Sequence, residues 1–136
     1  MVHLAKDAVA AAPIHLLFVS DAAAAKGASH PRILVVAERN AKATVIESYV
    51  ATGEAVYFTN AVTEISLADG ASVTHLKVQR ESPRAYHVGT VDARQGRDSH
   101  FVSFSFATGA ALSRTNVWTI LGGEGCGATL NGLYMA

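Results

Sequence analysis

The stretch Ile65-Ser66-Leu67-Ala68-Asp69-Gly70-Ala71-Ser72-Val73-Thr74-His75-Leu76 places a short polar turn between two apolar, strand-like runs. The same arrangement recurs in residues 35–46, 91–102 and 120–131. The turn residues of the four copies are Asn40, Gly70, Gly96 and Gly125, at spacings of 30, 26 and 29 residues. Glycine and asparagine tolerate positive φ best, so one left-handed backbone position is predicted in every copy. The chain therefore carries an internal repeat of variable length.

Aligning the four copies on their turns groups similar residues into columns. Two columns, five and three residues before the turn, are apolar or small: Val35, Ile65, Val91 and Ile120, then Ala37, Leu67, Ala93 and Gly122. This period of two is typical of strands, and both columns are predicted to face inward. Two polar columns, one residue before the turn and four after it, are predicted to face water: Arg39, Asp69, Gln95 and Glu124, then Thr44, Thr74, His100 and Thr129.

Stacked columns of like residues indicate an all-β solenoid, because each rung then buries its apolar face on its neighbours. The upstream halves of the copies, residues 57–62, 86–88 and 112–117, are also alike, so each rung should contain several short strands. The predicted fold is a parallel β-helix with rungs recurring about every 26 to 30 residues. A β-sandwich is the alternative, since short strands with regular turns also describe one.

Composition excludes several classes of protein. Half of the 136 residues are hydrophobic, enough for one compact core. Eleven basic and eleven acidic residues cancel, which argues against binding nucleic acid or an anionic membrane. Cys126 is the only cysteine, so an intrachain disulfide is excluded and a reducing cytoplasm is predicted. No apolar run is long enough for a membrane-spanning helix.

The N-terminal residues could be mistaken for a secretory signal. Residues 8–19 are apolar-rich, and residues 22–25 resemble a small-residue cleavage site. Pro13 and His15 interrupt the apolar stretch, and Asp7 stands where a signal peptide carries positive charge. We therefore expect residues 1–12 to be a poorly ordered or leader segment ahead of the core.

Two features near the C-terminus invite a functional interpretation. Gly123-Glu124-Gly125-Cys126-Gly127-Ala128 fits the loose pattern of a dinucleotide-binding loop. Such a loop must open a helix, whereas residues 129–135 are typical of a strand, so tight-turn glycines of a solenoid corner are favoured. The Cys126 thiol suggests sulfur or iron chemistry, but it aligns with Ala41 and Ala71 and is predicted to be a buried or semi-buried structural residue.

No catalytic, cofactor-binding or metal-binding residue is predicted. The six histidines are far apart and are each interpreted as hydrogen-bonded or surface residues: His3, His15, His30, His75, His87 and His100. The basic segments 80–84 and 94–98 are interpreted as solvated turns, partly neutralised by Glu81 and Asp98. The commonest nucleophile-elbow, zinc-protease and Walker motifs do not occur in the sequence.

The residues also resemble a known family. The stretches 30–38, 57–64, 75–82 and 125–134, the last ending Leu130-Asn131-Gly132-Leu133-Tyr134, are similar to the core of the SufB/SufD proteins, nearer to SufD. This resemblance implies a right-handed parallel β-helix and a non-catalytic scaffold in SUF iron–sulfur cluster assembly. The implied partners are a SufB-like protein and the SufC-like ATPase. The cluster would be handled by the whole complex, with no cofactor in this chain.

Residues 1–136 are expected to form one β-helix core domain and to be a fragment of a longer chain. In the family the ATPase-binding and cluster-proximal parts would lie beyond Ala136. Pairing of two copies through the edges of the β-helix is a further option. Two other functions stay open, a carbohydrate-active β-helix enzyme and a generic structural solenoid. The acids, spread mostly one per turn, speak against the enzyme, which needs converging carboxylates.

Overall fold

The computed structural model describes residues 1–21 and 26–135, and within these ranges the chain is built of strands and turns without a helix. Residues 22–25, weighed above as a cleavage site, lie outside the described residues. The strands are β1 (Val2–Leu4), β2 (Ile14–Ser20), β3 (Ala28–Ser29), β4 (Arg32–Ala37), β5 (Lys42–Ala51), β6 (Phe58–Leu67), β7 (Ser72–Glu81), β8 (Tyr86–Gln95), β9 (His100–Gly109), β10 (Leu112–Leu121) and β11 (Gly127–Met135).

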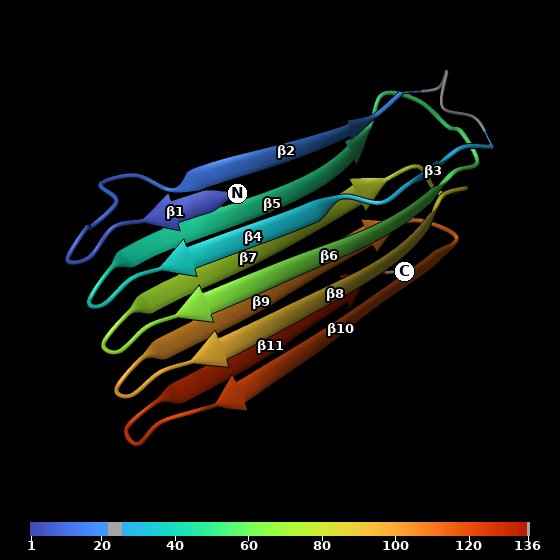
Figure 1. The fold of residues 1–136 in the computed structure, drawn as a ribbon. Helices are drawn as coiled ribbons and strands as arrows, with labels where there is room; N and C mark the ends of the chain where they lie inside the picture. The colour runs from blue at the N-terminus through green and yellow to red at the C-terminus, as the bar shows by residue number, and fades with distance from the viewer. Residues whose placement is uncertain (22–25, 136) are drawn as a thin grey trace.

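The strands form two sheets that face each other (Figure 1). The first sheet has the order β1-β4-β6-β8-β10, with the short β3 also paired to β6, and the second has the order β11-β9-β7-β5-β2. Every pairing is parallel, and strands that neighbour each other in a sheet belong to successive rungs. The predicted parallel β-solenoid is confirmed, and the β-sandwich is not formed.

Tight turns join the two sheets at one end of the solenoid and stack in register (Figure 1). Their left-handed residues are Asp7, Asn40, Gly70, Asp98 and Gly125. The amide of each of the first four donates to a carbonyl in the next turn, for example Asn40 to Asp69 at 3.0 Å and Asp98 to Glu124 at 2.9 Å. A Cβ at Gly70 would overlap the Asn40 side chain, so stacking as well as φ favours glycine there.

The prediction of Gly96 as the third turn residue is wrong, because Asp98 takes that position. The register of the third copy therefore moves by two residues, and Ile65 pairs with Ala93 in place of Val91. Both residues remain buried, since a shift of two preserves the face. Gln95 was predicted to face water, but it lies inside and donates to the Gly127 carbonyl at 2.9 Å.

Ile120 and Gly122 were also predicted to face inward, and both are exposed. Thr119, not Ile120, pairs with Ala93 of the preceding rung. The last turn has one residue more between its strand and Gly125 than the other turns have. A shift of one residue moves a side chain to the opposite face of the sheet, which explains the error.

The apolar core fills the half of the solenoid next to the tight turns. Its members come from both sheets and include Val35, Val45, Ile65, Val73 and Phe101. Leu4 of β1 belongs to it, and β1 pairs with β4, so residues of the segment 1–12 form part of the first rung.

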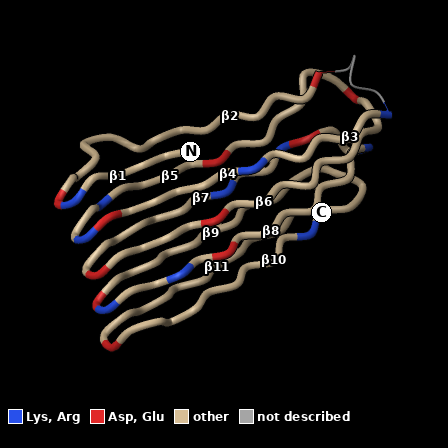
Figure 2. Tube along the Cα trace, in the orientation of Figure 1, with Lys and Arg blue, Asp and Glu red and all other residues tan. Residues whose placement is uncertain are grey.

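Charged residues gather on the stacked turns, as Figure 2 shows at the left of the view. Among the described residues, none belongs to a helix of the length and apolarity needed to cross a membrane.

Candidate functional site

The half of the interior away from the tight turns is polar. Strand β7 illustrates the change, because its inward residues run from Val73 to His75, Lys77, Gln79 and Glu81. Nine of the buried polar side chains there form what we call the interior polar cluster: Glu47, Tyr49, Thr59, Thr63, His75, Lys77, Gln79, Glu81 and His87. Burying so many polar groups is costly unless they bind one another.

Glu47 is one centre of this cluster. Its Oε1 accepts hydrogen bonds from Thr63 Oγ1 at 2.6 Å and from His75 Nε2 at 2.9 Å, and its Oε2 accepts one from Tyr49 at 3.0 Å. Burial would raise the pKa of Glu47, but the hydrogen bond and charge of His75, with help from Thr63 and Lys77, lower it below its usual value. Glu47 is therefore a buried carboxylate.

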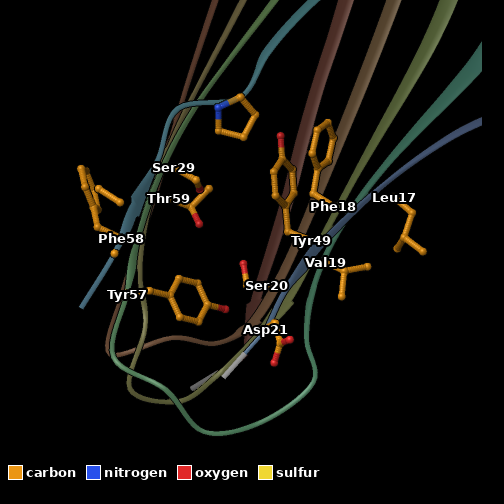
Figure 3. Close-up of a pocket in the computed structure, with 13 residues that line it drawn as sticks. Leu17, Phe18, Val19, Ser20, Asp21, Ser29, Tyr49, Tyr57, Phe58 and Thr59 are labelled. Atoms are coloured by element: carbon orange, nitrogen blue, oxygen red, sulfur yellow. The ribbon is translucent and has the colours of Figure 1, made fainter. Parts of the chain in front are cut away.

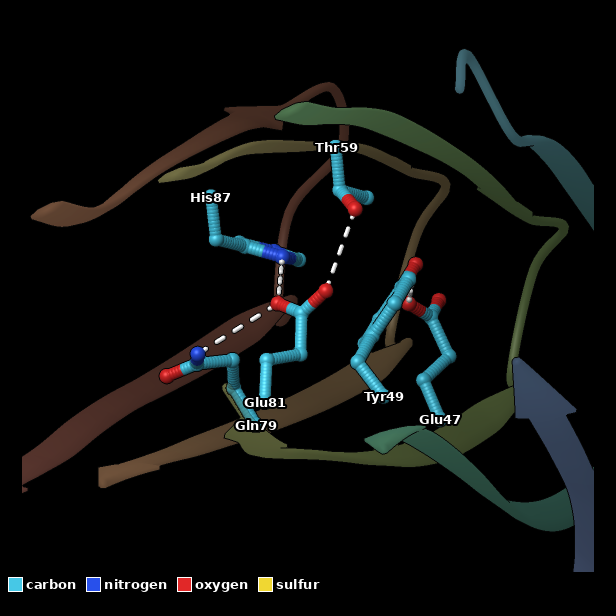
Figure 4. A network of polar contacts seen from close by, with 6 residues as sticks. All are labelled: Glu47, Tyr49, Thr59, Gln79, Glu81 and His87. Carbon is cyan, nitrogen blue, oxygen red and sulfur yellow. Dashed lines mark hydrogen bonds and ion pairs between the residues drawn. The ribbon is translucent and has the colours of Figure 1, made fainter. Parts of the chain in front are cut away.

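Glu81 is the second centre (Figure 4). His87 Nδ1 donates to its Oε2 at 2.6 Å, Thr59 donates to Oε1 at 3.0 Å, and Gln79 lies 3.3 Å from Oε2. Burial again opposes ionisation, and the contacts from His87, Thr59 and Gln79 outweigh it, so the pKa of Glu81 is lowered. The solvated-turn interpretation of Glu81 was wrong, because this residue points into the solenoid.

The charges of both carboxylates, Glu47 and Glu81, act on Lys77 and on Tyr49. Burial lowers the pKa of Lys77 to about 8, while the charges of Glu47 and Glu81 oppose that shift. The Lys77 ammonium lies 5.3 Å from the centre of the Tyr49 ring. Burial and the nearby Glu47 carboxylate raise the pKa of Tyr49, so its hydroxyl stays a donor.

Gly89 of β8 provides the space that Lys77 occupies. A Cβ at this position would overlap the Lys77 Nζ and would lie 3.3 Å from His87 Nε2. The absent side chain at Gly89 is therefore a condition for packing the lysine inside the solenoid. No positive φ is involved at this glycine, so close approach alone accounts for it.

Three buried atoms of the cluster have no hydrogen-bond partner: His75 Nδ1, His87 Nε2 and Gln79 Oε1. Because the ionised carboxylates only accept, each histidine carries a proton on the nitrogen that faces its glutamate. The second ring nitrogen of each is left without a partner. The cluster is thus well satisfied at its carboxylates and poorly satisfied at its imidazoles.

A cavity of about 510 Å³ opens beside this cluster, between strand β2 and strands β3 and β6 (Figure 3). Phe18, Tyr57 and Phe58 stand around it, and Tyr49 and Thr59 connect it to the carboxylates behind. The Phe18 and Tyr49 rings are stacked, with centroids 4.8 Å apart. The cavity walls are mainly apolar. Of the interior polar cluster, Tyr49 and Thr59 line the cavity and the other residues do not.

A comparison with known proteins gives this architecture a family. The family model described as "SUF system FeS cluster assembly, SufBD core domain" matches residues 18–136. The chain belongs to the SufBD family. The core-domain match includes every residue of the interior polar cluster.

Curated relatives of this SufBD family chain are much longer than it is. An iron–sulfur cluster assembly SufBD family protein of Synechocystis is 39% identical over 113 residues, covering 77% of this chain and 25% of the relative. The iron–sulfur cluster assembly protein SufD of Escherichia coli is 32% identical over 127 residues, covering 92% and 30%. The chloroplastic protein ABCI7 of Arabidopsis thaliana is 31% identical over 90 residues, covering 65% and 19%. No solved structure gives a significant match.

The glycine-rich stretch 123–128 and the thiol of Cys126 both lie at the last corner of the solenoid in this SufBD family chain. Residues 123–126 form the last turn, and the strand β11, not a helix, follows. Cys126 is half-buried, and its thiol lies 2.8 Å from the Gly123 carbonyl. It shares its column with Ala41 and Ala71, as predicted, and with Ser99, the residue after the left-handed Asp98.

The histidines divide into two groups. His75 and His87 are buried partners of the two carboxylates. The other four lie outside the interior: His3 contacts Glu38, His15 contacts Ser48, His30 packs edge-on against Phe58, and His100 is exposed. Within the described parts of the chain, no three histidine, cysteine or acidic residues are grouped as a metal site.

The interior polar cluster was missed by the sequence analysis. One signal was present in the sequence, since Val45 and His75 both stand five residues after their turn residues, and this shared position faces inward. The arrangement holds protons at defined atoms and buries two carboxylates together with two histidines and one lysine. Glu47 and Glu81 are enclosed and do not converge on an open surface where a polysaccharide could lie.

Proposed function

We propose that this chain is a non-catalytic, cytoplasmic scaffold component of a SUF iron–sulfur cluster assembly complex, pairing with a SufB-type protein and acting with a SufC-type ATPase. The observation that carries this proposal is the SufBD core-domain match over residues 18–136, on a chain built as one continuous parallel solenoid. The similarity to a curated SufD over 92% of the chain supports the SufD-like role.

The architecture suits a scaffold. Parallel pairing from rung to rung joins the strands into two regular sheets, and stacked repeats of this kind present extended surfaces to a partner. Iron and sulfide would then be substrates of the whole complex.

Co-expression tests the proposal. The full-length protein that carries this chain is tagged and expressed with the SufB-type and SufC-type proteins of the same organism. The purified material is assayed for both partners, iron and acid-labile sulfide. We expect the SufB-type protein to co-purify in a fixed ratio and the SufC-type ATPase to follow it.

The matched control is the same protein without its tag, carried through the same purification, from which neither partner should be recovered. Purification of the tagged full-length protein without either partner would overturn the proposal.

A further inference from the structure

The cavity beside the interior polar cluster has a buried hydrogen-bond donor in its wall. Tyr57, directly before β6, lines the cavity and is 4% exposed. Its hydroxyl is buried without a hydrogen-bond partner among the described residues, and Figure 3 shows it pointing into the cavity, toward β2. The other buried hydroxyls of the lining, on Tyr49 and Thr59, already donate to the carboxylates behind them. Tyr57 is therefore the donor that a bound molecule can use.

The walls on the two sides of the cavity are aromatic. Across from Tyr57 stand the stacked rings of Phe18 and Tyr49, which lie 12° from parallel (Figure 3). Aromatic side chains favour stacked or edge-on contacts with a further ring. The volume of about 510 Å³ lies within the range of roughly 300–1,000 Å³ that is usual for small-molecule sites. A compound of one or two flat rings therefore fits the shape of this cavity.

The charge of the lining restricts the ligand further. Of the described residues that line the cavity, Asp21 is the charged one, and no lysine, arginine or histidine stands with it. An anionic ligand would meet like charge there without a base to pair with. The Tyr57 hydroxyl requires an acceptor, which an ammonium group does not offer. A neutral acceptor, such as a carbonyl oxygen or a ring nitrogen, meets both conditions.

We propose that this cavity binds a neutral, planar aromatic molecule, which accepts a hydrogen bond from the Tyr57 hydroxyl while its ring contacts Phe18 and Tyr49. Binding would give the buried hydroxyl its missing partner and would remove apolar surface of the cavity from water. The site goes beyond the scaffold role and does not depend on it, because only the lining of the cavity takes part.

Calorimetric titration of the full-length protein that carries this chain tests the site with three probes of similar outline. Quinoline has a ring nitrogen as its acceptor, naphthalene has no acceptor, and 1-naphthoate is an anion. We expect saturable binding of quinoline, and about tenfold weaker binding of naphthalene, because naphthalene leaves the Tyr57 hydroxyl unpaired. The anion 1-naphthoate should bind more weakly than quinoline as well.

The variant Tyr57→Phe removes the donor and keeps the ring. Quinoline should then bind about as weakly as naphthalene does, a loss of about tenfold. The matched control is Tyr86→Phe, which removes a hydroxyl from an exposed tyrosine outside the cavity lining and should leave quinoline binding unchanged. Urea unfolding checks that both variants keep the fold.

Three outcomes would overturn the site. The first is that quinoline does not bind the original protein saturably. The second is that quinoline binds no better than naphthalene, or binds equally well in Tyr57→Phe, so that the hydroxyl plays no part in recognition. The third is that 1-naphthoate binds as tightly as quinoline, which contradicts the preference for a neutral ligand. None of these results bears on the scaffold role, which co-purification with the SufB-type protein tests separately.

Discussion

The interior of this solenoid has two halves that the same strands build with opposite chemistry. Next to the tight turns, the inward residues of β5 and β7 are Val45 and Val73, which pack in an apolar core. A few positions further along the same strands, Glu47, His75 and Glu81 are just as buried but polar. Burial alone therefore does not decide which residues a solenoid core accepts. The hydrogen-bond partners within reach decide it, because each buried carboxylate has three donors around it.

The largest expected effect comes from removing a carboxylate. Glu47→Ala leaves His75, Thr63 and Tyr49 without their acceptor inside the solenoid, and we expect a loss of about 3–5 kcal/mol in the free energy of unfolding. The comparison variant is Val45→Ala, two residues earlier on the same strand, where lost burial and a small cavity should cost about 2 kcal/mol. Urea unfolding measures both. A smaller loss for Glu47→Ala than for Val45→Ala would show that the three donors do not depend on the Glu47 carboxylate.

The next effect is a rise in stability with pH. The pKa of Lys77 is about 8 in the folded chain, below its ordinary 10.5. Below pH 8 both folded and unfolded chains hold the proton, so the cost of burying the charge is fully present. Between pH 8 and about 10 the folded chain releases it first, and the free energy of unfolding should rise by about 2 kcal/mol. Above pH 10 the raised pKa of Tyr49 reverses the trend.

Urea unfolding at pH 7, 8, 9 and 10 follows this rise, and Lys77→Met should abolish it. Lys42→Met changes an exposed lysine of the same sheet and should leave the rise in place. A flat profile for the original chain would show that the ammonium is not buried as described.

A smaller effect is expected at Gly89. Gly89→Ala places a methyl group where the Lys77 Nζ lies, and the overlap should cost about 1–3 kcal/mol. Because the clash is with one side chain, the double variant with Lys77→Met should recover most of the loss. A double-mutant cycle on unfolding free energies measures this coupling. Additive losses would mean that another contact opposes the new methyl group.

The smallest effect concerns one hydroxyl. Tyr49→Phe removes a donor to Glu47 and keeps the ring that stacks on Phe18, so we expect a loss of about 1 kcal/mol. Tyr86→Phe, at an exposed residue, should change the unfolding free energy by nearly nothing. Equal effects at the two tyrosines would show that the hydrogen bond from the Tyr49 hydroxyl to Glu47 does not contribute to stability.

Most of the repeat could be predicted from residue order, and its two errors lie in the third and fourth turns: a wrongly chosen turn residue in the third and one extra residue in the fourth. Asn40, Gly70 and Gly125 were found because glycine and asparagine are the usual left-handed residues. The third turn was assigned to Gly96, whereas Asp98, two residues later, has a φ of 54°. Aspartate also tolerates this conformation, and only the stacked hydrogen bonds between turns distinguish the two.

The interior polar cluster was not predicted, although the period of two was clear. Alternation shows that His75, Lys77 and Gln79 share one face of β7 and that Leu76 and Val78 share the other. Thr74, predicted to face water, puts Leu76 and Val78 on the outer face, whereas hydropathy would put both of them inside. The structure places His75, Lys77 and Gln79 inside, against hydropathy.

Residue order alone was sufficient for the strand-and-turn repeat, the parallel solenoid and the resemblance to the SufB/SufD core. The repeat and the solenoid follow from local conformational preference and periodicity, and the resemblance follows from similar stretches of sequence, all of which are written along the chain. The position of Glu47 beside His75 and of Glu81 beside His87, and the apolar face left outside, depend on how rungs stack. A side chain 28 residues away becomes a neighbour only when a rung closes, so three-dimensional packing settles the chemistry of both the interior and the surface.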